Sequence, residues 1–104
     1  MKKFIYLYHL DNPRMTPSEN ATANWMKWFE SMGENIVDGG NPFNAEENCQ
    51  AQIKDQKVAM DTKSTTGYSI VKATDLKAAV DMAMTCPMAY GDDSWVEVYE
   101  LLPM

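Results

Sequence analysis

The chain is poor in the residues that most often carry catalysis and metal binding. Its 104 residues include one histidine, His9, and two cysteines, Cys49 and Cys86. The cysteines are far apart and have no spacing partners, which fits a reducing cytosol better than a disulfide scaffold. No histidine is spaced to activate either thiol, so neither is expected to be a nucleophile. A metal centre needs several convergent ligands, and the pattern shows none, so we expect no metal and no cofactor.

Positive charge is also scarce. The chain has nine Lys and Arg residues and fifteen Asp and Glu residues, which gives a net charge of −6. The basic residues are scattered and form no stripe, so nucleic acid and anionic membrane are not expected partners. No run approaches the roughly 18 apolar residues of a membrane span. The N-terminal "MKKFIYLYHLDNP" is too short in its apolar part for a signal peptide, and we expect a strand there and a cytoplasmic protein.

Length and composition predict one globular domain over residues 1–104. Hydrophobic residues make up 45% of the chain, which excludes a disordered chain. Runs rich in aromatic and β-branched residues predict strands in Phe4–Leu10, "NIVDGGNPF", "TTGYSIVKA" and "WVEVYELL". The stretch "AQIKDQKVAM" predicts a hairpin that turns at Asp55 and Gln56.

Two helices are predicted from caps and apolar spacing. The first is expected to begin with Thr16, Pro17 and Glu19 as cap, first-turn proline and capping-box acid, and to end at Gly33. Its buried face is expected to comprise Ala21, Trp25, Trp28, Phe29 and Met32. The second is expected to be capped by Thr74 or Asp75 and stopped by Pro87. Its buried stripe is expected to comprise Leu76, Ala79, Val80 and Ala83.

This order of elements predicts an α+β fold: a ferredoxin-like β-α-β-β-α-β sandwich with an extra hairpin and both helices on one face of the sheet. Each helix is expected to connect strands that can pair in parallel through a right-handed crossover. Neither an internal repeat nor a linker interrupts the domain.

Alternation along the strands predicts a sheet that is apolar on both faces. The small aliphatic side chains are expected beneath the helices. The other face is expected to carry Phe4, Tyr6, Tyr8, Tyr68, Trp95 and Tyr99. An exposed aromatic face of that size usually marks an interface, so we expect a homodimer packed sheet to sheet. The alternative is that the hairpin folds back over this face.

The run "GYSIVKATDLKAAVDMAMTCP" resembles the second half of the YCII-related (DGPF-type) family. "NIVDGGNPF" is similar to the family's second strand, and "WFESMG" to the end of its first helix. The resemblance implies a single YCII-related domain that pairs into a dimeric α+β barrel. In some members of the family a His/Asp pair has been proposed as an active site, with the histidine early in the first helix. The chain lacks the family's histidine early in the first helix, where "NATANW" stands, and lacks the DGPF loop, but Asp38 matches the acidic position.

These observations leave two kinds of site open. The first is a cavity on the aromatic face that holds a small, partly apolar molecule, with the expected ligand-binding residues Tyr6, Tyr8, Tyr68, Trp95, Glu97 and Tyr99. The second is an enzyme site with isomerase, lyase or monooxygenase-like chemistry, in which Asp38 or His9 moves a proton. By alternation His9 is expected on the Ile5 and Leu7 face, away from the aromatic residues. A pure interaction module without a cavity is the third possibility.

Overall fold

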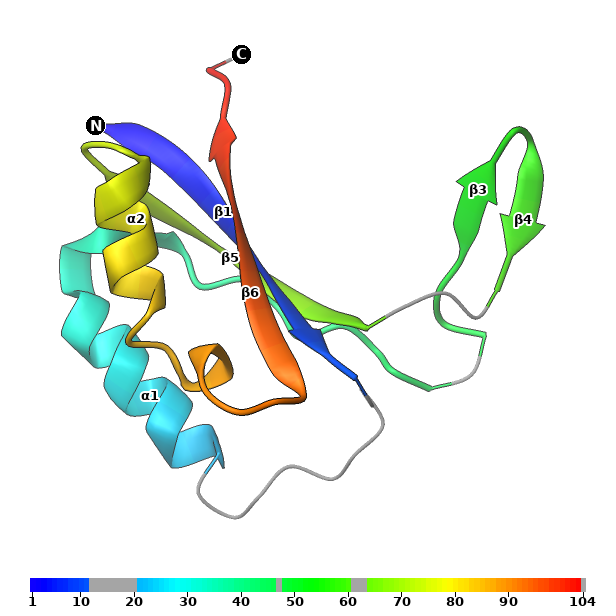
Figure 1. The fold of residues 1–104 in the computed structure, drawn as a ribbon, viewed down its shortest axis with the longest axis horizontal. Helices are drawn as coiled ribbons and strands as arrows, with labels where there is room; N and C mark the ends of the chain where they lie inside the picture. The colour runs from blue at the N-terminus through cyan, green and yellow to red at the C-terminus, as the bar shows by residue number, and fades with distance from the viewer. Residues whose placement is uncertain (12–20, 47, 61–63, 104) are drawn as a thin grey trace.

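Four strands form the central sheet of the structure, a computed structural model that describes residues 1–11, 21–46, 48–60 and 64–103 (Figure 1). They are β1 (Lys2–Leu10), β2 (Ile36–Asp38), β5 (Thr65–Ala73) and β6 (Ser94–Leu101). Their order in the sheet is β2-β5-β1-β6, and every neighbouring pair is antiparallel. The expected parallel pairing is therefore wrong. Strand β5 lies between β1 and β2, so the strands that α1 connects run in the same direction without touching.

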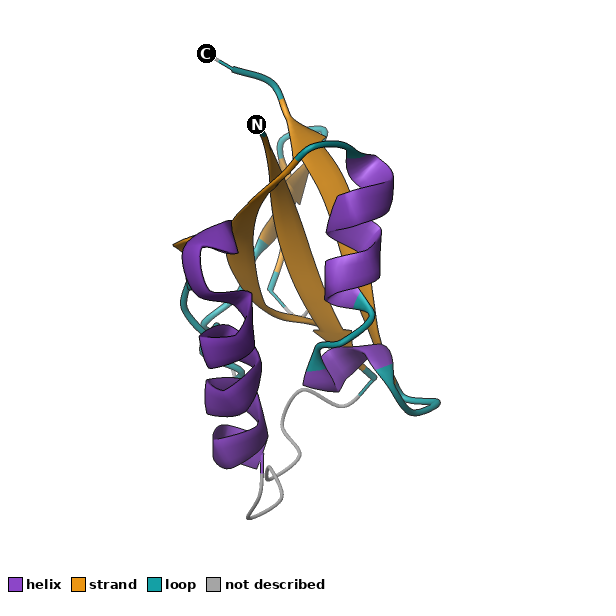
Figure 2. Ribbon diagram, turned by 90° about the vertical axis from the view of Figure 1, so that its left-hand side faces the viewer, coloured by secondary structure: helices purple, strands orange, loops and turns teal. Residues whose placement is uncertain are grey.

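Both helices cover the same face of this sheet (Figure 2). They are α1 (Ala21–Met32) and α2 (Leu76–Ala83), and short 3-10 turns follow each of them, η1 (Gly33–Asn35) and η2 (Pro87–Ala89). The protein is thus a small α+β protein with a four-stranded antiparallel sheet and two helices, an arrangement compatible with the expected ferredoxin-like fold. The predicted hairpin forms a separate two-stranded sheet of β3 (Gln52–Lys54) and β4 (Lys57–Ala59).

The helix ends follow local rules for satisfying backbone groups. The carboxylate of Asp75 accepts the amide of Ala78 at 2.8 Å, so Asp75 rather than Thr74 is the cap of α2. Gly33 has a φ of +52°, which confirms the predicted left-handed end of α1. The predicted first-helix cap at Thr16, Pro17 and Glu19 lies outside the described residues.

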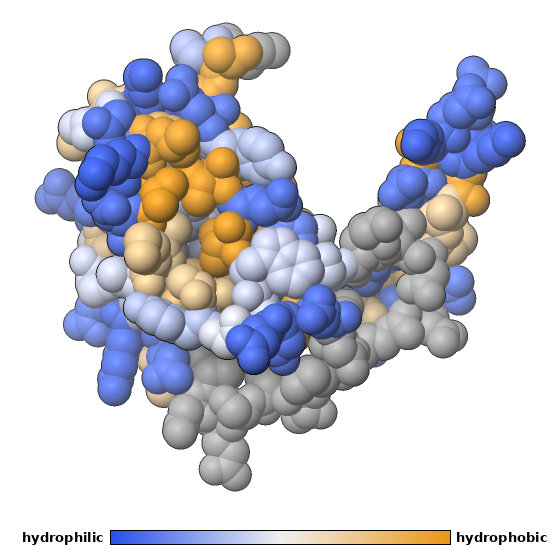
Figure 3. Space-filling model, viewed as in Figure 1, coloured by the Kyte–Doolittle hydropathy of each residue, from blue (hydrophilic) through white to orange (hydrophobic). Residues whose placement is uncertain are grey.

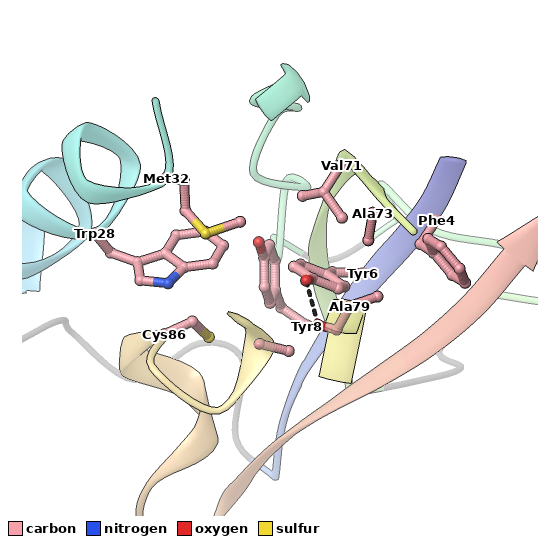
Figure 4. Packing of buried hydrophobic residues seen from close by; sticks show 10 residues of the cluster. Phe4, Tyr6, Tyr8, Trp28, Met32, Val71, Ala73, Ala79 and Cys86 are labelled. Atoms are coloured by element: carbon pink, nitrogen blue, oxygen red, sulfur yellow. Dashed lines mark hydrogen bonds between the residues drawn. The ribbon is translucent and has the colours of Figure 1, made fainter. Parts of the chain in front are cut away.

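The core lies between the sheet and the helices (Figure 4). Trp28 and Met32 of α1 and Ala79 and Ala83 of α2 are buried there, as their helical spacing predicts. Leu76 and Val80 were expected in the same stripe, but their exposed fractions are 50% and 36%. That expectation is wrong because α2 turns Ala79 and Ala83 inward, with Ala78 and Met82 partly buried beside them, and leaves Leu76 and Val80 toward solvent.

Phe4, Tyr6 and Tyr8 are the largest contribution of β1 to this core, which corrects the prediction that they line the open aromatic face. Their exposed fractions are 0%, 0% and 5%. In the observed register Tyr6 lies opposite Ser69 of β5 and Val98 of β6, both on the helix side. Alternation sorted the residues within each strand correctly. It could not show which face of β1 matches which face of its neighbours, because that depends on the pairing register.

The two buried tyrosine hydroxyls find partners inside the protein. Tyr6 donates to the carbonyl of Ala79 in α2. Tyr8 donates to Oγ of Ser69 at 2.8 Å, and Ser69 donates in turn to the carbonyl of Gly39 at 2.8 Å. These bonds link β1 to both α2 and the loop after β2. The tyrosine rings fill the core, and their hydroxyl groups fix the position of the rings.

We call residues 51–60, which contain β3 and β4, the arm. Figure 1 shows it projecting from the body on the side of the sheet opposite the helices, and Figure 3 shows an open hollow between the two. Every residue of the arm is exposed. The alternative that the hairpin folds back over the sheet is therefore wrong, and the face opposite the helices is left uncovered by it.

Raising the pH should unfold the protein through its buried tyrosines. Burial raises the pKa of both Tyr6 and Tyr8 far above the ordinary value of 10.0. The folded state then holds these protons more tightly than the unfolded state does, so their contribution is complete below pH 10 and is lost as the pH rises further. Each tyrosine should lower the free energy of unfolding by up to about 1.4 kcal/mol per pH unit. Urea denaturation between pH 8 and 11.5 measures this slope.

Tyr8→Phe separates the two contributions. The variant should lose about 1 kcal/mol at neutral pH, the usual net worth of one hydrogen bond. It should also show a shallower decline above pH 10. Tyr90→Phe, which alters a ring with 68% exposure, should leave the neutral-pH stability unchanged. Identical alkaline slopes for Tyr8→Phe and the wild type would contradict the assignment.

Candidate functional site

The sole histidine lies on the uncovered face of the sheet, at a β-bulge. The register between β1 and β5 shifts between Tyr8 and His9, so that Tyr8 lies opposite Gly67 and His9 opposite Thr65. A bulge adds one residue to one strand and redirects the neighbouring side chains. Here it brings the start of β5 and the preceding Ser64 toward the end of β1, where the amide of Leu10 donates to the carbonyl of Ser64 at 2.8 Å.

We call the uncovered side of the sheet the open face. Its members follow from the register, in which Leu7 lies opposite Tyr68 and Glu97, and Ile5 lies opposite Ile70 and Tyr99. Since paired residues point to the same side of a sheet, the part of the open face that β1, β5 and β6 supply comprises Lys3, Ile5, Leu7, His9, Thr65, Tyr68, Ile70, Lys72, Trp95, Glu97, Tyr99 and Leu101. The expectation that His9 lies away from the aromatic residues is therefore wrong.

His9 contacts groups from two segments that are distant from it in sequence. Its ring stacks on Trp95 with centroids 5.0 Å apart and planes 6° apart. Nδ1 lies 3.2 Å from Oγ of Ser64 and 3.4 Å from Oγ1 of Thr65. Nε2 contacts Oε1 of Glu97. The side chain is buried, so these contacts replace water around both ring nitrogens.

The contact between His9 and Glu97 is close but poorly directed. Among the described residues, the buried Nε2 makes no well-directed hydrogen bond, although Oε1 of Glu97 lies against it. The buried imidazole therefore packs against a carboxylate that is itself partly exposed.

Glu97 is the part of this network that solvent can reach. Its side chain is 41% exposed, compared with 9% for His9. The hydroxyl of Tyr99 donates to Oε2 of Glu97 at 3.0 Å, and this bond holds the pKa of Tyr99 above its ordinary value. Trp95 and Tyr99 beside it are 40% and 50% exposed. The open face thus presents a carboxylate, hydrogen-bonded at one oxygen and contacted at the other, between two exposed aromatic rings.

Tyr68 is the remaining predicted ligand-binding residue on the open face. It is half-buried, and its ring lies 6.1 Å from that of Phe43, with the planes tilted by 30°. The predicted set is therefore divided by the sheet. Tyr68, Trp95, Glu97 and Tyr99 share the open face, whereas Tyr6 and Tyr8 are buried under the helices and cannot touch a ligand on that face.

Asp38 has a structural role in the turn that follows β2. One carboxylate oxygen accepts the amide of Gly40 at 2.8 Å, as aspartates in turns commonly do. Gly40 has a φ of +78° and packs directly on the carbonyl of Tyr68. Asp38 is exposed and belongs to β2, which β5 separates from β1. The two predicted proton-transfer residues, Asp38 and His9, therefore do not form one site.

The cysteines lie apart from this network. Cys86 is fully buried beside the core tyrosines, and burial raises the pKa of its thiol. Cys49 is exposed, and both are free thiols. Within the described ranges no group of three His, Cys, Asp or Glu side chains could hold a metal ion. The helices of the same part of the chain are all too short or too polar to cross a membrane.

Sequence reasoning missed two contributors to the site, Ser64 and Thr65. Their hydroxyls face His9 only because of the bulge, and a one-residue register shift leaves no mark in a run such as "STTGY". A weak signal was present. Placing Leu7 opposite Tyr68 would have put the sole histidine on the aromatic side.

No protein-family model matches the chain, and no curated protein matches it either. The resemblance to the YCII-related family therefore rests on the quoted motifs alone.

The Asp38 turn should be intolerant of a side chain at Gly40. A Cβ atom there would overlap the carbonyl oxygen of Tyr68, and the positive φ adds strain. Gly40→Ala should cost more than about 3 kcal/mol of unfolding free energy. Gly33→Ala is the matched control, because that glycine also has a positive φ but open space around it, and it should cost about 1–2 kcal/mol. Equal losses in urea denaturation would contradict this packing.

Removing the Glu97 side chain should destabilise the fold, because the buried Nε2 of His9 would lose the carboxylate that contacts it. Glu97→Ala leaves a buried ring nitrogen without its carboxylate, which should cost about 1–3 kcal/mol. Glu100→Ala on the same strand is the control. That side chain lies 3.6 Å from Lys2 in an exposed pair and should cost less than about 1 kcal/mol. If both variants unfold at the same urea concentration, the His9 contact contributes nothing to stability.

Proposed function

We propose that the chain pairs into a homodimer through its open face and that the pair binds a small, partly apolar molecule there. Trp95, Tyr68 and Tyr99 would provide the apolar contacts and Glu97 the polar one. The observation that carries this proposal is the Glu97 carboxylate between exposed rings. A surface of aromatic contacts with one oriented polar group is the usual composition of a small-molecule site.

The case for a second copy comes from the apolar surface that the fold leaves in water. Two helices shield one face of the sheet, and the other exposes large parts of Trp95 and Tyr99. Burying a large apolar side chain is worth roughly 1.5–3 kcal/mol. A second sheet packed on the open face would bury these rings and turn a shallow surface into an enclosed one.

This assembly would be a dimeric α+β barrel made from two ferredoxin-like halves. The strand order β2-β5-β1-β6, with both helices on one side, supports a ferredoxin-like half. The likeness of "NIVDGGNPF" and "GYSIVKATDLKAAVDMAMTCP" to the YCII-related family supports the same assembly. The proposed function is thus that of a YCII-related binding protein.

The polar group on the open face indicates what the ligand offers. A carboxylate accepts hydrogen bonds and attracts positive charge. Because Glu97 is exposed while His9 is buried behind it, a ligand would meet the acceptor first. We therefore expect a ligand with an apolar ring or chain and an amine or hydroxyl donor.

Three probes of similar size test this assignment: benzylamine, benzyl alcohol and benzoate. Binding is followed by tryptophan fluorescence and by amide chemical shifts of β6. Benzylamine should bind most tightly and benzoate least, and Glu97→Gln should weaken benzylamine at least threefold. Glu100→Gln, a charge change outside the open face, should have no effect. Tighter binding of benzoate, or shifts confined to the helices, would overturn the proposal.

A second candidate function is proton transfer by the same network. The specific observation in its favour is that the His9 ring lies between a carboxylate and two hydroxyls, a setting in which an imidazole can pass a proton. An isomerase or lyase acting next to a carbonyl would use it. Deuterium uptake by cyclohexanone in D2O, catalysed by the wild type and abolished in His9→Gln, would support this function. Uptake at the uncatalysed rate would exclude it for that class of substrate.

A further inference from the structure

The arm is an amphipathic hairpin that has no core of its own. Ile53 pairs with Val58, and Lys54 pairs with Lys57. Because side chains alternate along a strand, one side of the arm is apolar and the other mostly polar. The apolar side carries Ala51, Ile53, Val58 and Met60. Ile53 is 73% exposed, Val58 60% and Met60 47%, so this side faces water along its whole length.

The turn of the arm does not make the hairpin stable by itself. Asp55 and Gln56 have φ values of +51° and +62°. Two positive φ values in a two-residue turn suit Asn-Gly or Gly-Gly, and a glutamine there costs roughly 1–2 kcal/mol. A lone two-stranded hairpin is at best marginally stable in water. The contacts that hold the arm together must therefore come from outside it.

The position of the arm indicates where those contacts lie. It stands on the open-face side of the sheet and away from its own body (Figure 1 and Figure 3). A second copy placed on the open face would come alongside it. Within one chain both the arm and the open face stay exposed, and a pair of chains can bury both through one twofold contact.

The arm and the rest of the chain carry opposite net charges. The arm contains Lys54, Lys57 and Asp55, a net charge of +1. Since the whole chain carries −6, the rest of the chain carries −7. The open face itself carries Lys3 and Lys72 as well as Glu97, so most of this negative charge lies elsewhere on the body. An arm of one copy is thus attracted to the body of another at long range.

The exposed area is also in excess of what a compact monomer shows. The chain exposes 7539 Å², whereas a compact monomer of 11.8 kDa exposes about 5,900 Å². A stable interface buries about 800 Å² on each partner. The surplus is large enough to supply such an interface and still leave an ordinary surface.

We propose that the arm is the contact by which two copies hold each other, with its Ile53 and Val58 side packed on the second copy beside the open face. The arm of one copy then forms part of the wall of the ligand site of the other. This inference rests on the homodimer of the proposed function and adds the segment that closes it.

The test compares two lysine substitutions on one strand of the arm. Ile53→Lys places a charge on the apolar side, and Gln52→Lys places the same charge on the neighbouring polar side. Both positions are exposed, so both variants should fold, which far-UV circular dichroism checks. Sedimentation equilibrium should show at least a tenfold higher dimer Kd for Ile53→Lys and less than a threefold change for Gln52→Lys.

Hydrogen exchange of the wild type provides a second measurement. The amides of β3 and β4 should become protected as the protein concentration rises through the dimer Kd. A dimeric wild type with equal Kd values in both variants, and with arm amides that exchange fast at every concentration, would overturn the arm contact and leave the proposed homodimer intact. A wild type that stays monomeric at millimolar concentration would overturn both.

Discussion

The pairing register of β1 is the constraint on which the rest of the structure depends. As the inner strand between β5 and β6, β1 decides which side chains of all three share a face. With Tyr6 opposite Ser69 and Val98, the β1 aromatics enter the core and their hydroxyls bond inside it. A shift by one residue would turn Phe4, Tyr6 and Tyr8 to the open face and place His9 under the helices. Core and site are therefore two results of one pairing.

The same register explains why a histidine can be buried on a face that is otherwise open. Trp95 covers one side of the imidazole, and Glu97 and the hydroxyls of Ser64 and Thr65 surround its edge. A buried polar ring is costly unless its nitrogens have partners. Here the hydroxyls at the bulged start of β5 lie beside Nδ1, and Glu97 of β6 contacts Nε2 without a well-directed hydrogen bond. The result is a carboxylate positioned at the surface by its neighbours, and recognition of a small molecule requires such a positioned group.

Local features of the fold could be predicted from the sequence, and relations between strands could not. The strand Thr65–Ala73 and the glycine end of α1 follow from residue preferences that act over a few positions, and the hairpin turn at Asp55 and Gln56 follows from the break between two short strand runs. The face shared by Trp95, Glu97 and Tyr99 followed from alternation. The placement of Tyr6, Tyr8 and His9 relative to that face did not, because both faces of β1 are apolar and either one could have met the helices. The bulge at His9 left no pattern at all.

The arm and the open face both leave apolar side chains exposed to water, and both therefore need an explanation. Each is an apolar surface next to charged groups, and no element within residues 1–11, 21–46, 48–60 and 64–103 covers either of them. A single exposed apolar surface could be explained by the binding of an unrelated partner. Two such surfaces on the same side of the chain support the proposed homodimer, because a twofold axis would place each beside the other without any further component. In such an assembly the Glu97 carboxylate would lie in an enclosed site bounded by both copies. The exclusion of water from that site would lower the local dielectric constant and strengthen the attraction between the carboxylate and a donor group of the ligand.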